Sequence, residues 1–363
     1  MPQICPKLLA DPGPAAEPFA RETIRRLGQV RAQLGRRALI LGHHYMSDAV
    51  IGWADAVGDS LALSRLAATQ KEAEFIVFCG VHFMAETADI LAGQGRRVIL
   101  PDGGAGCPMA DMAAPEQVEQ CWQELARLGH GPIIPITYVN SSARLKAFCG
   151  RHGGAVCTSS NARAVLAWAL GQGRRALFFP DQHLGRNTAL ALGLTPREIA
   201  MWRRDAAVLE GEAAQARVIV WDGFCPVHVE FGPADVARAR ARQAGVKVVV
   251  HPECPSQVVA LADDSGSTEK IIGLVEAAPA GSAWAIGTEI NLVRRLAARF
   301  ADKTIFSLNE SVAGCPDMAK ISPTNLLASL EAILDGKPRG VVGVDEATAR
   351  QAAVALERMF AVS

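Results

Sequence analysis

The stretch VILPDGGAGCPMAD, residues 98–111, passes from an apolar strand pattern through small residues to a cysteine that precedes proline, Cys107. Two later stretches repeat this arrangement. VIVWDGFCPVH, residues 218–228, carries Cys225, and TIFSLNESVAGCPDM, residues 304–318, carries Cys315. In each case a predicted strand ends in a loop that presents a Cys-Pro pair. This recurrence indicates that the chain is built from like units that each contribute one cysteine.

Short apolar runs alternate with helical patterns along nearly the whole chain, from RRALILGHHY near residue 40 to KTIFSL near residue 305. Continuous apolar strands separated by helices are typical of parallel sheets that are covered on both faces. The sequence therefore predicts an α/β fold. In such sheets ligands bind beyond the carboxyl ends of the strands, so we expect the site to be assembled from strand ends.

Two segments show an internal repeat, which marks repeated architectures. HHYMSDAVIGWADAVGDS (43–60) and HPECPSQVVALADDSGST (251–268) share the spacing of His, Ala-Asp, Gly and a terminal hydroxyl. His43 and Cys107 are 64 positions apart, and so are His251 and Cys315. A middle unit begins at TYVN, and its surplus length is expected between ALFFPD and VIVWDG.

From this repeat we predict three similar Rossmann-like αβα units with pseudo-threefold symmetry around a central site. The expected domains are 1–125, with an N-terminal helical lead-in, 126–240, and 241–363, with C-terminal helices. One of the three cysteines falls in each domain, so the three loops are expected to carry their thiols to a shared site.

Composition and charge exclude several classes of protein. The 363 residues include 37 Lys and Arg and 37 Asp and Glu, so no basic excess argues for nucleic acid. No apolar stretch reaches the roughly 18–20 residues that span a bilayer, and the proline-rich start does not fit a signal peptide. We expect a cytoplasmic protein without a membrane partner. Its nine cysteines are then expected to be thiols or metal ligands rather than disulfides.

Three convergent thiolates suit zinc or an iron–sulfur cluster, because both favour soft ligands. The spacing matches neither a zinc ribbon nor a bacterial ferredoxin, since no C-x-x-C occurs. Cys5 and Cys254 also precede proline, and packing is the better explanation for any single cysteine taken alone. The equal offsets favour Cys107, Cys225 and Cys315. His228, three residues after Cys225, is either a further ligand or a residue that faces a substrate cavity.

Both tyrosines of the chain, Tyr45 and Tyr138, end predicted strands, where a proton donor would be useful; packing in the core is the alternative. The hydroxyls of Ser60, Ser159 and Thr268 lie near predicted helix starts. They either cap these helices or help to bind a carboxylate or phosphate group there.

These motifs together resemble the quinolinate synthase (NadA) family, from about residue 38 to Cys315. The residues of the motifs GHHY and IGTEINLV are similar to those in the longer branch of the family, which is found in bacilli. The segments that carry the resemblance are GHHYMSDAVIGWADAVGDSLALSRLA, FCGVHFMAETADIL, AGCPMADM, TYVNSSARLKAF, VCTSSNA, FFPDQHLGRNTA, WDGFCPVHVEF, VVVHPECPSQVVALADDSGST and WAIGTEINLV.

The resemblance implies three α/β domains around a [4Fe–4S] cluster whose protein ligands are Cys107, Cys225 and Cys315. The fourth iron would remain open as a Lewis acid. The implied enzyme is a synthase of NAD biosynthesis without net redox change. It condenses iminoaspartate with dihydroxyacetone phosphate to quinolinate, phosphate and water. L-Aspartate oxidase or aspartate dehydrogenase would supply the iminoaspartate.

The resemblance also implies site residues. Proton-transfer roles fall on Tyr45 and Glu253. The expected substrate-binding residues, to which we add His228 from its position, are His43, Ser60, Tyr138, Val139, Asn140, Ser159, His228, His251, Pro252, Glu253 and Thr268. Two other classes remain open: a hydro-lyase with a similar three-cysteine cluster, and a zinc-stapled structural or binding protein.

Overall fold

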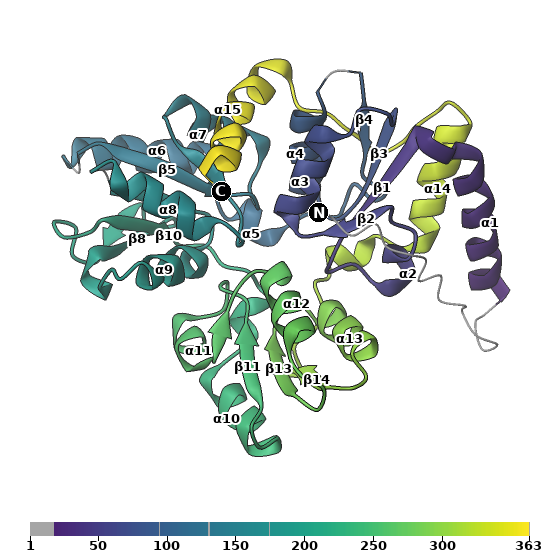
Figure 1. The fold of residues 1–363 in the computed structure, drawn as a ribbon. Coiled ribbons are helices and arrows are strands. Elements are labelled where there is room, and N and C mark those ends of the chain that lie inside the picture. Colours follow the sequence, from purple (N-terminus) through teal and green to yellow (C-terminus); the bar gives the residue numbers. More distant parts are fainter. Residues whose placement is uncertain (1–17, 94, 130, 174, 363) are drawn as a thin grey trace. The chain divides into compact units, whose positions relative to one another are not determined.

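The computed structural model describes residues 18–93, 95–129, 131–173 and 175–362; Cys5 and the proline-rich start lie outside this part. Three mainly parallel sheets flanked by helices confirm the predicted α/β class (Figure 1). The chain groups into two compact units, Met1–Cys107 with Gly314–Val344 and Pro108–Ala313 with Asp345–Ser363. The three-domain limits at 125 and 240 stay a prediction. Among the described helices, none is long and apolar enough to cross a membrane.

The first sheet has the order β15-β4-β3-β1-β2 and is parallel except at β15. Strand β3 is buried at every residue, which explains its continuous apolar run FIVFC. The strands are β1 (Ala38–His43), β2 (Ala56–Gly58), β3 (Phe75–Cys79), β4 (Arg97–Ile99) and β15 (Val341–Val342). The helices of this unit are α1 (Pro18–Leu34), η1 (Gly35–Arg37), α2 (Asp48–Ile51), α3 (Ser60–Thr69), α4 (His82–Ala92), η4 (Met318–Lys320) and α14 (Pro323–Leu334).

The second sheet has the order β6-β5-β7-β10-β8-β9. Its antiparallel hairpin β8–β9 lies between ALFFPD and VIVWDG, where the surplus of the middle unit was expected. The strands are β5 (Ile133–Tyr138), β6 (Ala155–Cys157), β7 (Arg175–Phe179), β8 (Ile199–Arg203), β9 (Val208–Glu210) and β10 (Val218–Trp221). The helices are α5 (Pro108–Asp111), α6 (Pro115–Arg127), α7 (Ala143–Arg151), α8 (Ala162–Gly171), α9 (Gln182–Ala191), η2 (Pro196–Glu198), η3 (His228–Glu230) and α15 (Glu346–Val362).

The third sheet has the order β12-β11-β13-β14 and is entirely parallel. Figure 1 shows helices on both sides of it. The strands are β11 (Lys247–Val250), β12 (Asp264–Ser265), β13 (Ala283–Gly287) and β14 (Thr304–Ser307). The helices are α10 (Pro233–Arg242), α11 (Ser256–Leu261), α12 (Thr268–Ala277) and α13 (Ile290–Arg299).

The three sheets share one core order of strands. In each sheet, the strand that comes first in the chain lies between the second and third strands of the repeat. The strand that precedes the cysteine loop lies on the other side of the third strand. The three orders are β2-β1-β3-β4, β6-β5-β7-β10 and β12-β11-β13-β14. This common order confirms that the sequence repeat reflects a structural repeat. It also gives every cysteine loop the same place after the fourth core strand.

The repeat between the first and third sheets extends to individual hydrogen bonds. The Ile40 N–H donates to Asp55 Oδ2 (2.7 Å), and the Asp55 N–H donates to the Ile40 carbonyl (2.8 Å). Val248 and Asp263 exchange the same two bonds, each of 2.8 Å. The Asp of each Ala-Asp pair therefore fixes the start of a short second strand.

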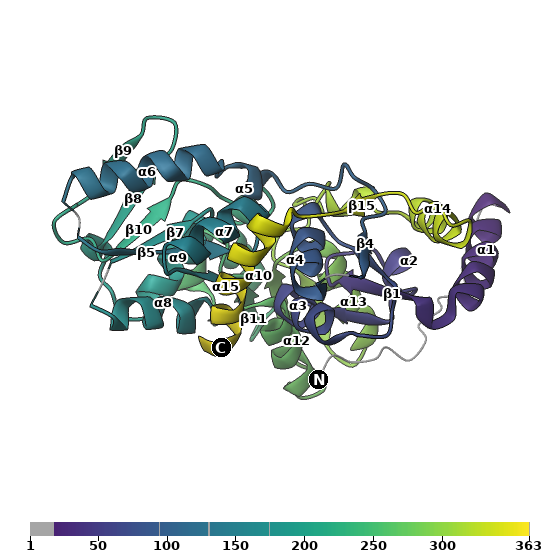
Figure 2. The ribbon, with the colours of Figure 1, turned by 90° about the horizontal axis from the view of Figure 1, so that it is seen from above.

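Helix α15 lies against α7 in both views of the ribbon (Figures 1 and 2). Gly150 of α7 sits at the closest approach, since a Cβ atom there would lie 1.9 Å from the carbonyl oxygen of Gln351. The backbone of α15 occupies the space that any other side chain would need. Glycine at this position therefore allows the two helices to touch.

Gly150→Ala is expected to lower the free energy of unfolding by about 1–3 kcal/mol, because overpacking forces backbone shifts. Gly28→Ala is the matched control: Gly28 is an exposed residue of α1, and a Cβ there meets nothing within 4 Å. That change should stabilise the protein slightly, by up to ~1 kcal/mol. Urea unfolding measures both, and equal stability of the two variants would contradict the packing argument.

Candidate active site

Each of the three cysteine loops is followed by the same helix start. A proline eight positions after the cysteine occupies the first turn of a helix: Pro115 of α6, Pro233 of α10 and Pro323 of α14. Proline suits this position because its missing N–H would be unpaired there in any case. The spacing Cys-Pro-x6-Pro is readable from the sequence, but our sequence analysis missed it.

The loops of Cys225 and Cys315 also share their backbone hydrogen bonds. The Cys225 carbonyl accepts from the Val229 N–H (3.2 Å), and the Cys315 carbonyl accepts from the Ala319 N–H (3.1 Å). A short 3₁₀ helix follows in both, η3 and η4. The two loops therefore present their thiols from the same local backbone structure.

Lys320 ties the loop of Cys315 to that of Cys107 within one unit. Its Nζ donates to the carbonyl of Gly104 (2.7 Å) and to Asp317 Oδ1 (2.6 Å). Gly104 lies three residues before Cys107, and Asp317 lies two residues after Cys315. A single ammonium group thus connects the two cysteine loops.

Cys107, Cys225 and Cys315 differ from the other described cysteines in exposure. These three are half-buried, whereas the remaining five are buried. Burial raises the pKa of Cys79 to about 12 and also raises the pKa values of Cys121, Cys149, Cys157 and Cys254. A thiol held protonated is a poor metal ligand. The three half-buried thiols on like loops are therefore the donor set that fits a cluster.

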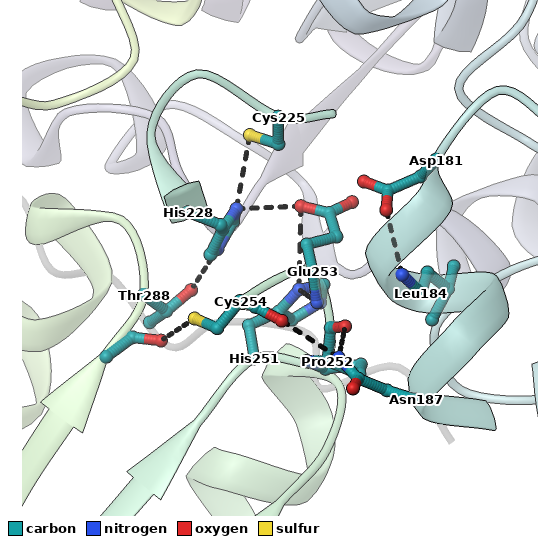
Figure 3. Close-up of polar contacts among 11 residues, drawn as sticks. Asp181, Leu184, Asn187, Cys225, His228, His251, Pro252, Glu253, Cys254 and Thr288 are labelled. Atoms are coloured by element: carbon teal, nitrogen blue, oxygen red, sulfur yellow. Dashed lines mark hydrogen bonds and ion pairs between the residues drawn. The ribbon is translucent and has the colours of Figure 1, made fainter. Parts of the chain in front are cut away.

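A buried carboxylate and two imidazoles lie beside Cys225 (Figure 3). Glu253 Oε2 lies 2.7 Å from His228 Nδ1 and 3.5 Å from His251 Nδ1. His228 Nδ1 is also 3.2 Å from Cys225 Sγ, and its Nε2 is 3.1 Å from Thr288 Oγ1. Cys225, His228 and Glu253 offer ligand atoms within 4.8 Å of one another, so this group could hold a metal ion.

Electrostatics divide these groups into charged and neutral members. Burial favours the neutral form of Glu253, but His251, His228 and the Tyr138 phenol outweigh it and lower the pKa of Glu253 to about 2. Burial lowers the pKa of His251 to about 3. Burial, and then the charge of Glu253, raise the pKa of Asp181 well above its ordinary value. Glu253 is therefore the carboxylate that carries the charge.

The loop that presents Glu253 is held from α9. Asn187 Nδ2 donates to the carbonyls of Pro252 and Cys254, both at 2.8 Å (Figure 3). The Glu253 N–H in turn donates to His251 Nδ1 (3.4 Å). Because one side-chain amide donates hydrogen bonds to the backbone on both sides of Glu253, the loop holds the Glu253 carboxylate in place.

Other expected site residues lie at strand ends of the same unit. Tyr138 ends β5 and is 5% exposed, and its neighbour Val139 donates its N–H to Cys157. Asn140 Oδ1 and Thr268 Oγ1 are buried and have no hydrogen-bond partner among the described residues. Such atoms are expected where a polar ligand binds. Ser159 is half-buried and lies in the turn before α8.

His43, Tyr45 and Ser60 belong to the other unit. His43 ends β1, and its Nδ1 accepts from the Tyr45 N–H (3.2 Å), as His251 Nδ1 does from Glu253. The His43 and Tyr45 rings meet edge to face with centroids 4.8 Å apart. Tyr45 in the first repeat therefore occupies the position that Glu253 has in the third.

The structure rejects the capping role for two of the hydroxyl residues. Asp59 and Ser267 are the N-caps of α3 and α12, and each side chain accepts a backbone N–H. Ser60 and Thr268 are instead the first residues of these helices. Their hydroxyls are not needed as caps, which leaves ligand binding as the role to test.

Three residues of this site were not predicted from the sequence: Asp181, Asn187 and Thr288. Asp181 and Thr288 follow strands β7 and β13, so their place at strand ends was a usable signal. Asn187 lies in the middle of α9, where no pattern marks it.

Comparisons with known proteins agree with the site. A family profile described as "Quinolinate synthetase A protein" matches residues 24–361. The quinolinate synthase of Bacillus velezensis is 51% identical over 340 residues, 93% of each chain. That of Corynebacterium glutamicum is 51% identical over 94% of this chain and 88% of its own. That of Streptomyces coelicolor is 49% identical over 97% and 91%.

The fold and site define a repeated α/β enzyme with acid–base groups and a cysteine loop at strand ends. The sequence is about 50% identical to those of the quinolinate synthases above, over more than nine-tenths of this chain, and this similarity identifies one family within the class. The chain belongs to the quinolinate synthase (NadA) family.

Proposed function

We propose that this chain condenses iminoaspartate with dihydroxyacetone phosphate to form quinolinate, phosphate and two waters. Quinolinate synthesis for NAD biosynthesis is the function of the family to which it belongs. One structural observation supports the chemistry most directly. An ionised, buried Glu253 lies within hydrogen-bond distance of His228 beside the half-buried thiol of Cys225. Acid–base and soft-ligand groups therefore lie together in one unit.

The chain's own residues supply binding and proton transfer. The substrates are bound by polar and strand-end residues of the second and third repeats and by two residues of the first. Those of the second and third repeats are Tyr138, Val139, Asn140, Ser159, His251, Pro252 and Thr268, and those of the first are His43 and Ser60. The two unpartnered polar atoms of Asn140 and Thr268 support this assignment. Glu253 accepts a proton from a substrate carbon or nitrogen, and the phenol of Tyr45 returns one to a leaving hydroxyl. His228 holds the carboxylate of Glu253 in position.

Cys107, Cys225 and Cys315 are the proposed ligands of the [4Fe–4S] cluster that the family carries. Their exposure and shared loop structure support this choice over the five buried thiols. The cluster would supply a Lewis-acid iron that polarises substrate oxygen atoms. We assign the protein to the cytoplasm, where reducing conditions preserve thiols. L-Aspartate oxidase or aspartate dehydrogenase is the proposed source of iminoaspartate.

A coupled assay tests the function. Anaerobically purified protein is incubated with L-aspartate, L-aspartate oxidase, an electron acceptor for the oxidase other than oxygen, and dihydroxyacetone phosphate, and quinolinate is measured by chromatography. We expect quinolinate and phosphate in equal amounts, dependent on both substrates. Cluster-replete protein that forms neither product would overturn the proposal.

Cys225, His228 and Glu253 are also a donor set that zinc accepts, so zinc is the competing metal. Iron, zinc and acid-labile sulfide are therefore measured on the same preparation. Iron and sulfide in equal amounts support a cluster. Stoichiometric zinc without sulfide would instead favour the zinc-stapled protein.

A further inference from the structure

Asp181 has one carboxyl oxygen that the protein leaves without a partner. The residue is fully buried and caps α9, where its Oδ1 accepts the Leu184 N–H at 2.8 Å. Its Oδ2 is buried and has no hydrogen-bond partner among the described residues. Glu253 is in the same situation, since Oε2 contacts His228 but Oε1 is buried without a partner. Two buried carboxyl groups thus each have one unpaired oxygen.

These two carboxyl groups face each other. Figure 3 shows the side chain of Asp181 at the start of α9 directed toward that of Glu253. Two ionised carboxylates offer only acceptors, so they cannot form a hydrogen bond with one another. If one of them carries a proton, that proton satisfies both unpaired oxygens at once. A buried polar atom without a partner has lost its hydration with no bond in return, so this pairing is strongly favoured.

The surroundings decide which group holds the proton. Glu253 Oε2 lies 2.7 Å from His228 Nδ1, and the hydrogen bonds from His228 and the Tyr138 phenol favour the ionised form of Glu253. Asp181 has no cation among its described contacts that would do the same, and burial with the charge of Glu253 raises its pKa. Cys254 is likewise kept protonated, because burial and then the charge of Glu253 raise its pKa. The pocket therefore accommodates one negative charge, and Glu253 carries it.

We propose that Asp181 is a positioning residue that stays protonated and donates a hydrogen bond from Oδ2 to Oε1 of Glu253. The bond satisfies Oε1 and fixes the orientation of the Glu253 carboxylate, whose Oε2 lies beside His228. No net proton is gained or lost at Asp181 during turnover. The proposal rests on the proposed role of Glu253 in quinolinate formation.

Two substitutions at Asp181 separate this role from helix capping. Asp181→Asn keeps an oxygen that accepts from Leu184 and places an N–H₂ donor where the acid proton is. Asp181→Ser keeps a capping oxygen but is too short to reach Glu253. We expect Asp181→Asn to retain kcat within about threefold. Asp181→Ser should lower kcat by roughly 10- to 100-fold, which corresponds to the loss of one hydrogen bond to a charged group.

The pH profile adds a signature that a purely structural role would not produce. The titratable groups that interact with Asp181 are Glu253, Cys254 and His183, and Glu253 in turn interacts with His228, His251 and Tyr138. In the wild-type enzyme, ionisation of Asp181 at high pH places a second negative charge beside Glu253 and breaks the bond. The wild-type kcat should therefore fall on the alkaline side. In Asp181→Asn this fall should be absent or displaced to higher pH.

Infrared spectroscopy provides a readout that does not depend on activity. The difference spectrum between the wild-type holoenzyme and Asp181→Asn at pH 7 should show the C=O stretch of a protonated carboxylic acid, which shifts in D₂O. Loss of a carboxylate band instead would overturn the proposal. So would wild-type kcat in Asp181→Ser, or equal losses in both variants. If the wild-type enzyme itself formed no quinolinate, the proposed function would fail while the infrared result would still decide the state of Asp181.

Discussion

Serine in place of Cys107, Cys225 or Cys315 is expected to abolish quinolinate formation and to reduce bound iron and sulfide to background. A serine hydroxyl is a hard ligand that is protonated at neutral pH, whereas iron–sulfur clusters require soft thiolates. The three loops share their strand order and helix starts, so no one of them is expected to be dispensable. Iron and sulfide analysis of anaerobically purified variants measures the effect.

Cys254→Ser is the matched control, because Cys254 also precedes a proline and lies one residue from Glu253. It is fully buried, and its thiol donates to the Gly287 carbonyl (3.7 Å), a bond that serine can also donate. This variant should keep its cluster. If Cys254→Ser lost the cluster and one of the three other variants retained it, the ligand assignment would be wrong.

Replacement of Glu253 by glutamine is expected to lower kcat by a factor on the order of 10² to 10⁴, the usual contribution of a positioned acid–base group. Glutamine keeps the size of the side chain but cannot accept a proton. Because Asn187 holds the backbone on both sides of residue 253, the loop should keep its structure. Cluster content and KM should therefore change little while kcat falls.

Asp235→Asn serves as the control for this loss. Asp235 is also a buried carboxylate of the same unit, but it accepts the Gly232 N–H (2.7 Å) at the start of α10. Its substitution should reduce stability and leave kcat near normal. If Glu253→Gln behaved in the same way, with lower stability and unchanged turnover, Glu253 would be a structural residue.

The strands of this protein could be predicted from the sequence because helices cover both faces of each sheet. The apolar runs predicted between RRALILGHHY and KTIFSL all form strands, since burial on both faces requires continuous apolar residues. The strands β2, β8, β9, β12 and β15 were missed. Strands β2 and β12 contain only three and two residues, without an apolar run, and they form because Asp55 and Asp263 pair with the neighbouring strand. Their structure depends on a partner rather than on local propensity.

The sequence also predicted the repeat, the cysteine loops and the residues at strand ends, because parallel strands place their carboxyl ends at one edge of the sheet. It did not predict which polar groups contact one another at that edge. His228 reaches Thr288 across 60 positions, and Asn187 reaches Cys254 across 67. No local pattern encodes such contacts, since they depend on how two sheets of one unit place their loops. The sequence by itself determined the strand ends and the chemistry available at them. Only the tertiary structure decided that Asp181 faces Glu253, because burial from several elements at once sets both their proximity and their charge.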